Sequence, residues 1–282
     1  MKFAAFSGVL IDYSIQEAMR LTKQLGFDGI EIAAREHHLS PMTSRTQLKE
    51  LHALSEDLQL AIPVLATYTG RFSSASDQEA AATFDDFRRL LEAAGQLEAS
   101  MIRVLAGGPN AFLAQDYHYS KAAYWLGCCA EEAKAYNVDV LVELHNETLV
   151  ETADDALKLS RLVNSERMGF IHDAGNMYIA GTEYGFESVK KLGRHLKHVH
   201  IKDERRTSDS SAPGSFTNRT QRGVETFSPC RLGEGEVDHE PLFQALRETG
   251  YNNWVTLECH TPESGFERLK HDFDCVMKLA NG

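Results

Sequence analysis

Four side chains of the types that bind divalent cations lie in the second half of the chain, each at the end of a short apolar run. They are Glu143 in DVLVELHN, Asp173 in MGFIHDAGN, His200 in KHVHIKD and Glu258 in WVTLECH. Three carboxylates and one imidazole suit a hard or borderline divalent cation. If the four runs are parallel strands of a closed barrel, their carboxyl ends converge at one mouth, and the sequence predicts a metal site there.

Such a site supports proton chemistry next to a carbonyl group. A divalent cation held by two adjacent substrate oxygens stabilises the negative charge that develops when a proton leaves the neighbouring carbon, so that an enediolate becomes accessible. We expect Glu143 and Glu258 to act as the base and the acid. Return of the proton to the opposite face gives epimerisation, transfer to the adjacent carbon gives isomerisation, and loss of a β-hydroxyl gives dehydration. The ligand set leaves these three reactions open.

The elements that must position these residues follow from the alternation of short apolar runs with long amphipathic segments, which is typical of repeated βα units. Strands are expected near residues 2–7, 29–33, 61–68, 101–107, 139–145, 168–174, 197–203 and 254–260. Helices are expected near residues 14–26, 46–59, 77–98, 119–137, 152–164, 185–196, 238–250 and 265–280. Eight units predict an α/β fold, a single (βα)8 TIM barrel over residues 1–282, with a doubly wound open sheet as the alternative.

Strand alternation separates residues that face the barrel interior from those that face the helices. Apolar residues of the fifth, seventh and eighth strands share the outer face, which turns Glu143, His200 and Glu258 inward. The sixth strand alternates less cleanly, but Asp173 also has the inner parity. All four candidate ligands are therefore predicted to face the interior.

The same alternation places His145, Lys202 and His260 two residues beyond ligands, near the mouth. There they could contact the substrate or a ligating carboxylate, and the alternative is that they are solvated loop residues. Two further charged residues, Glu31 on the second strand and Arg103 on the fourth, also have the inward parity. We expect these two to form an ion pair with each other inside the barrel.

A polar segment over residues 204–236 follows the seventh strand and is rich in Ser, Thr, Gly and Arg. Long loops at this end of a barrel usually build or cover the active site, so the fold is predicted to carry a long loop here; the alternative is a mobile solvated insertion. Arg206 at its start could bind a phosphate or carboxylate. In the loop after the third strand, Tyr68 is a further candidate substrate contact.

The amino-acid composition of the chain limits the kinds of molecule that it is expected to bind. The net charge is −12, which opposes attraction to a phosphate backbone, so we expect a small-molecule substrate and no nucleic acid. No apolar stretch is long enough for a membrane span, and the expected location is cytoplasmic. The five cysteines form no CxxC pair and are expected to be reduced thiols.

Motifs along nearly the whole chain resemble the xylose-isomerase-like sugar phosphate isomerase/epimerase superfamily, which includes ketose 3-epimerases, inosose dehydratase and a 3-dehydroshikimate dehydratase branch. The resemblance lies in GFDGIEI, IRVLAGG, LVELHNETLVETADDALKL, HDAGNMYIAG, HVHIKDERR and LGEGEVDHEPLFQALRETGYNNWVTLE. It implies that Glu143, Asp173, His200 and Glu258 are the metal ligands. The implied cation is manganese, with magnesium, cobalt or zinc as alternatives, and homo-oligomers are common among members.

The resemblance also implies substrate contacts, with two departures. Arg206 falls where the epimerases use an arginine near the substrate and the metal. Asn176 stands where epimerases often have a histidine, and we expect it to contact the substrate. Leu149 replaces a second substrate-binding carboxylate, while the stretch around His145 is closer to the dehydratase branch.

The leading hypothesis is therefore a metal-dependent isomerase or epimerase of a small sugar, sugar phosphate or related ketone. A dehydratase of the 3-dehydroshikimate or inosose type is the alternative. An endonuclease IV-like DNA repair enzyme shares the barrel but assembles several zinc ions with many histidines, and both Asn176 and the acidic charge oppose it. A noncatalytic sugar-binding barrel would not need all four ligand types.

Overall fold

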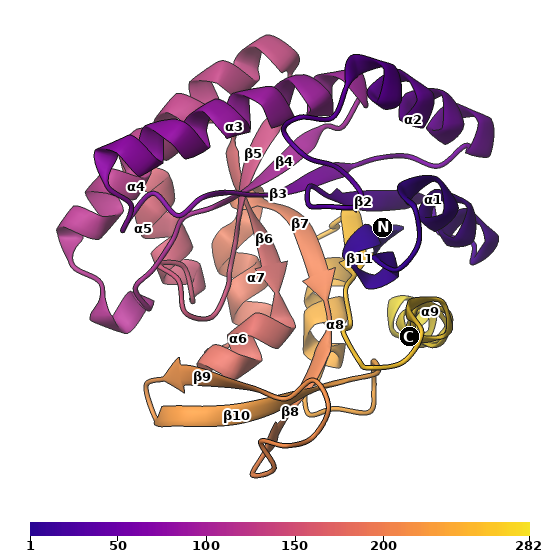
Figure 1. The fold of residues 1–282 in the computed structure, drawn as a ribbon. Helices are drawn as coiled ribbons and strands as arrows, with labels where there is room; N and C mark the ends of the chain where they lie inside the picture. The colour runs from indigo at the N-terminus through magenta and orange to yellow at the C-terminus, as the bar shows by residue number, and fades with distance from the viewer.

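The computed structural model describes residues 1–282, and eight parallel strands form a closed barrel surrounded by helices (Figure 1). Around the barrel the order is β1-β11-β7-β6-β5-β4-β3-β2, so strands that follow one another in βα units are neighbours. The predicted TIM barrel is confirmed, and the doubly wound alternative is wrong. The barrel strands are β1 Lys2–Phe6, β2 Gly29–Ala33, β3 Val64–Gly70, β4 Met101–Leu105, β5 Asp139–Glu143, β6 Met168–Asp173, β7 Leu196–Ile201 and β11 Trp254–Leu257.

Most helices begin where local sequence signals predict a start. Ser14, Ser44, Ser76 and Thr152 each cap a helix and form a reciprocal capping box with the residue three positions later, which satisfies otherwise unpaired N–H groups. One short helix, α6, begins directly after β6 and was not expected. The helices are α1 Ile15–Gln24, α2 Arg45–Leu58, α3 Asp77–Gln96, α4 Asp116–Ala133, α5 Ala153–Val163, α6 Ala174–Ala180, α7 Phe186–Leu192, α8 Glu240–Glu248 and α9 Gly265–Asn281.

Two separate apolar clusters show that the strand alternation was predicted correctly. The larger one packs the outer strand faces against the helices and includes Val142, Val199 and Leu257. The smaller one consists of Val64, Met101, Leu141 and Ile171, which come from four adjacent strands. Because Leu141 and Ile171 alternate with residues of the outer cluster, the smaller cluster fills the barrel interior below the candidate ligands.

The predicted long connection after β7 is present, and much of it has regular secondary structure. It forms a three-stranded antiparallel sheet of β8 (Asp203–Thr207), β10 (Gly223–Cys230) and β9 (Phe216–Thr220), in that order. We call this sheet the insertion sheet; in Figure 1 it projects from the barrel beside α6. Few side chains of these strands pack on an apolar surface, so most of them are polar. The composition of the strands therefore resembles that of a loop.

The insertion sheet is held to the barrel at both sides. Near its start, the Asp203 carboxylate accepts hydrogen bonds from the N–H groups of Gly233, Gly235 and Val237, which return the chain to the barrel. On the far side, Asn146 Nδ2 donates to Asn218 Oδ1 at 2.8 Å and Arg219 N donates to a loop carboxylate at 3.0 Å. These contacts oppose the alternative of a mobile solvated insertion.

All five cysteines are free thiols. No helix combines the length and the apolar character that crossing a bilayer requires.

The outer face of β6 also carries a buried histidine that makes stability depend on pH. His172 Nε2 lies 2.9 Å from Ser188 Oγ of α7, and burial lowers the pKa of His172 to about 3. The unfolded chain takes up a proton at this residue near pH 6.5, whereas the folded chain does not, so stability is lost as pH falls below 6.5.

We therefore expect His172→Gln, whose amide can still bond Ser188, to reduce the pH dependence of unfolding. Between pH 7 and pH 5 the free energy of unfolding should fall by about 2 kcal/mol less in the variant than in the unsubstituted protein. Urea unfolding at the two pH values measures this difference within each protein, so that a general loss of stability cancels. Equal pH dependence in both proteins would show that His172 is not the titrating group.

Candidate metal centre

The structure brings the four predicted ligands together at the carboxyl ends of the barrel strands. Glu143, Asp173, His200 and Glu258 are all buried, and one donor atom from each lies within 4.8 Å of the others. His200 Nδ1 is 3.4 Å from Glu143 Oε1, 3.3 Å from Glu258 Oε2 and 3.9 Å from Asp173 Oδ2. Two ligands bound about 2.1 Å from one cation lie roughly 3.0 to 3.5 Å apart, so the spacing is close to that of a coordination shell.

Two donor atoms of this group lack hydrogen-bond partners. His200 Nδ1 and Asp173 Oδ2 are buried and unsatisfied, although Lys202 Nζ approaches Asp173 Oδ2 to 3.0 Å. Burial raises the pKa of Asp173 to about 8, with repulsion from Glu143 and Glu258 and partial relief from Lys202. Lys202 therefore compensates only part of the cost of burying an ionised Asp173. The donor set fits a divalent cation, which would satisfy both atoms.

Each of the two glutamates is also held by a cationic side chain. Arg103 donates to Glu143 Oε2 at 2.9 Å, and Lys202 donates to Glu258 Oε1 at 2.8 Å. Burial alone would raise the pKa of both carboxyls, but Arg103 lowers the pKa of Glu143 well below its usual value and Lys202 lowers that of Glu258. Both glutamates are therefore ionised at neutral pH, with one oxygen toward His200 and the other toward a fixed cation.

The unexpected helix α6 fixes the geometry on the β6 side. The Asp173 carboxylate caps this helix by accepting from Asn176 N through Oδ1 at 2.8 Å, which leaves Oδ2 for the cluster. Asn176 is buried, and its Nδ2 donates to Glu143 Oε1 at 2.9 Å. Asn176 thus orients two candidate ligands from behind and does not line the cavity described below.

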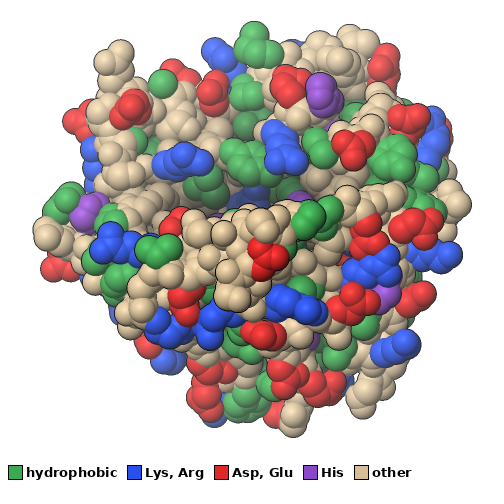
Figure 2. All heavy atoms as spheres, turned by 60° about the horizontal axis from the view of Figure 1, so that its bottom comes forward, with side chains coloured by type: hydrophobic (Ala, Val, Ile, Leu, Met, Phe, Trp, Pro, Cys, Tyr) green, Lys and Arg blue, Asp and Glu red, His purple; other side chains and the backbone are tan.

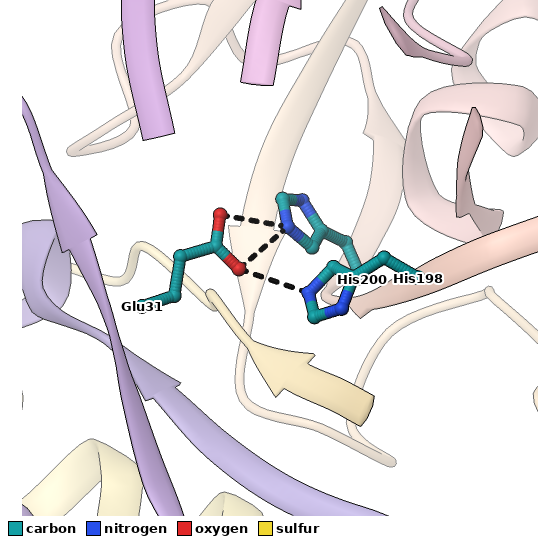
Figure 3. A group of neighbouring side chains, drawn as sticks. All are labelled: Glu31, His198 and His200. Atoms are coloured by element: carbon teal, nitrogen blue, oxygen red, sulfur yellow. Dashed lines mark hydrogen bonds and ion pairs between the residues drawn. The ribbon is translucent and has the colours of Figure 1, made fainter. Parts of the chain in front are cut away.

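The prediction that Glu31 and Arg103 form an ion pair is wrong, because each of these residues has a different partner. Arg103 bonds Glu143, whereas Glu31 bonds His198 and His200 of β7 (Figure 3). His198 Nε2 and His200 Nε2 lie 2.9 Å and 3.1 Å from Glu31 Oε2. Alternation predicted that these side chains face inward, but it does not say which of them meet across the barrel.

A cavity of about 630 Å³ opens above the cluster. Four of the predicted substrate contacts line it, namely Tyr68, His145, Lys202 and His260. Figure 2 shows a hollow on this face, with basic and histidine side chains visible inside it. The Arg103 guanidinium lies over the Tyr68 ring at 5.2 Å, and Arg103 Nε is buried without a hydrogen-bond partner.

The structure does not bring Arg206 to this cavity. Its Nε pairs with Glu225 Oε1 of β10 at 2.9 Å, and its side chain is 47% exposed. Phe6, Glu147 and the glycines after β4 also line the cavity and were not predicted from the sequence. These residues belong to a strand end and to loops, where neither alternation nor spacing tells which side chains converge.

Comparison with known proteins identifies the family of this chain. The family model described as a xylose isomerase-like TIM barrel matches residues 19–279. Inosose dehydratase of Clostridium perfringens is 28% identical over 129 residues, which span 45% of this chain and only 42% of that protein. Fructoselysine 3-epimerase of Escherichia coli O157:H7 is 24% identical over 263 residues, 90% of this chain and 89% of that protein.

A similar fold occurs among solved structures. The IOLI protein with a binding zinc atom superposes with a TM-score of 0.79 at 17% identity, covering 100% of this chain and 98% of that one. At this identity the likeness shows the fold alone. Because the family model covers most of the barrel, the chain belongs to the xylose isomerase-like TIM-barrel family.

Proposed function

We propose that the protein is a divalent-metal-dependent isomerase or epimerase that acts on a small sugar, sugar phosphate or related ketone. The observation that carries this proposal is the pair of ionised glutamates that approach one imidazole nitrogen from two sides, each with its second oxygen on a fixed cation. Relatives named as a 3-epimerase and a dehydratase support the same reaction group. The net charge of −12 continues to oppose an extended nucleic-acid contact.

The proposed ligands are Glu143, Asp173, His200 and Glu258, and manganese is the expected cation, with magnesium, cobalt or zinc as alternatives. The zinc found in the IOLI protein supports a divalent ion of this group. When bound, the cation would polarise the substrate carbonyl and stabilise negative charge on the neighbouring oxygens.

The proton is carried by the two glutamates in this proposal. Glu143 removes the proton next to the carbonyl. Glu258, which is ionised at rest, takes up a proton from solvent and delivers it to the opposite face, and Glu143 then releases its proton to solvent. A carboxylate oxygen that accepts one hydrogen bond keeps a second lone pair, so Arg103 and Lys202 can hold the two oxygens in place while protons move. Both cations also keep the glutamates deprotonated between turnovers.

Two histidines in the cavity wall are suited to sugar hydroxyls. Burial lowers the pKa of His145, and it lowers that of His260 to about 4, so both rings are neutral at pH 7. A neutral imidazole offers one donor and one acceptor, as a hydroxyl group does. His145 Nδ1 donates to the Asn146 carbonyl at 2.7 Å, which leaves Nε2 as an acceptor.

A dehydratase is the second candidate, and one observation favours it. Arg103 Nε is buried in the cavity wall without a partner, and Lys202 lines the same cavity. A carboxylate-bearing ketone of the 3-dehydroshikimate kind would place its charge near both cations, whereas a neutral ketose or inosose carries no such charge. The same two glutamates would then remove the proton and assist the departure of a β-hydroxyl.

The experiment that separates these candidates starts with the metal content of the purified protein. The loaded protein is then incubated in D2O with ketoses, inososes and 3-dehydroshikimate. Deuterium incorporation without loss of water supports the isomerase or epimerase, and a new conjugated absorbance supports the dehydratase. A protein that binds no divalent cation would contradict both.

We expect Glu143→Gln to weaken metal binding and to reduce the rate of the assigned reaction by about 10²- to 10⁴-fold, because an oxygen ligand and a proton acceptor are lost together. Steady-state rates and metal titration measure the two effects. Glu151→Gln is the matched control, since Glu151 is also buried but bonds Asn110 and loop N–H groups. If Glu143→Gln kept full metal content and the full rate, Glu143 would have no place in the mechanism.

Metal affinity should depend steeply on pH. A cation binds only the deprotonated forms of Asp173, whose pKa is raised to about 8, and of His200, whose pKa is raised by Glu31 and Glu258 despite burial. Affinity should therefore rise with pH, by about tenfold per unit for each proton released, between pH 6 and pH 8. Calorimetric titration in buffers of different ionisation enthalpy counts the protons, and a pH-independent affinity would contradict the assignment.

A further inference from the structure

Behind the candidate metal centre, one carboxylate is bonded by two histidines inside the barrel (Figure 3). Glu31 of β2, His198 and His200 have fully buried side chains. His198 Nε2 is 2.9 Å from Glu31 Oε2, and His200 Nε2 is 3.1 Å from both Glu31 oxygens. Neither Glu31 nor His198 lines the cavity, so the substrate does not reach them.

The contact with Glu31 decides which nitrogen of His200 faces the cluster. An ionised carboxylate only accepts hydrogen bonds, so the proton of a neutral His200 ring must lie on Nε2. Nδ1 then carries the free lone pair, and Nδ1 is the atom that lies 3.3 to 3.9 Å from the three candidate carboxylate ligands. Without an acceptor at Nε2, the other tautomer would place a proton where a cation would bind.

Glu31 is held by two residues of β7, and Thr256 of the neighbouring β11 lies against one of them. His198 Nε2 lies 2.9 Å from Thr256 Oγ1 of β11 as well as from Glu31, and β11 pairs with β7. Each of the two histidines approaches the Glu31 carboxylate through Nε2, so the carboxylate has little freedom to turn away.

We infer that Glu31 is a positioning residue for the metal centre, which accepts the Nε2 proton of His200 and thereby presents Nδ1 as a ligand. His198 supports it by holding the carboxylate in place. The inference rests on the proposed metal-dependent function, and it goes beyond it by assigning a role to a buried glutamate that touches neither cation nor substrate. Partners of this kind orient the histidine and increase its basicity as a ligand.

The test compares divalent-cation affinities of full-length variants. Mn²⁺ and Co²⁺ are titrated into Glu31→Gln, the unsubstituted protein and Glu151→Gln, the buried glutamate that serves as the matched control. We expect Glu31→Gln to bind both ions about 10- to 100-fold more weakly and to change the visible absorption of bound Co²⁺, with Glu151→Gln unchanged. Equal affinity and an unchanged Co²⁺ spectrum in folded Glu31→Gln would overturn the inference.

Three further outcomes are informative. If Glu31→Gln does not fold, Glu31→Asp keeps the charge but draws the carboxylate away from the rings, and unweakened binding by that variant would overturn the inference equally. Two ions bound per chain would also overturn it, because a second cation between Glu31 and the histidines would replace the hydrogen bonds. Absence of binding by the unsubstituted protein would instead contradict the proposed function itself, so the two failures are distinct.

Discussion

The structure depends on the burial of carboxylates in the mouth and interior of the barrel. Four of them are at most 5% exposed, namely Glu31, Glu143, Asp173 and Glu258. An ionised carboxylate that leaves water loses several kcal/mol of solvation unless charged or hydrogen-bonded partners compensate. Arg103, Lys202 and the β7 histidines supply part of this compensation, but the raised pKa of Asp173 indicates that this carboxylate is left without enough of it. A divalent cation would provide the missing partner.

Strand register explains why two ligands are glutamates and one is an aspartate. Asp173 and His200 are aligned across β6 and β7, and Thr256 of β11 lies at the same level. Glu143 is aligned with Ile171, two residues below Asp173, whereas Glu258 lies two residues beyond Thr256. A glutamate reaches about one methylene further than an aspartate, and the tilt of the barrel strands reduces the remaining offset between these levels. A shorter carboxylate suffices where the strand is already at that level.

The sequence predicted most of what regular periodicity controls. Barrel strands, the surrounding helices and the inward face of the four ligands follow from alternation and helical patterns, and the structure agrees. Pairings across the barrel were not predictable in this way, because alternation gives the face of a residue and not its partner, so Glu31 was wrongly paired with Arg103. The insertion sheet was missed because its polar strands pack on little apolar surface, and α6 because a helix of seven residues has no distinct period.

The candidate metal ligands and the cavity wall come from different parts of the fold. Residues proposed for the reaction are therefore largely distinct from residues that could select the substrate. All four candidate ligands lie on barrel strands or directly after them, whereas much of the wall comes from the loops that follow β3, β4 and β5. The β5 loop that carries His145 is tied to the insertion sheet through Asn146 and Asn218. The insertion sheet therefore constrains a loop that borders the substrate, although its own Arg206 points elsewhere. In the proposed reaction, the fixed centre would form the enediolate, while the loops and the insertion sheet would select the ketone and direct the return of the proton.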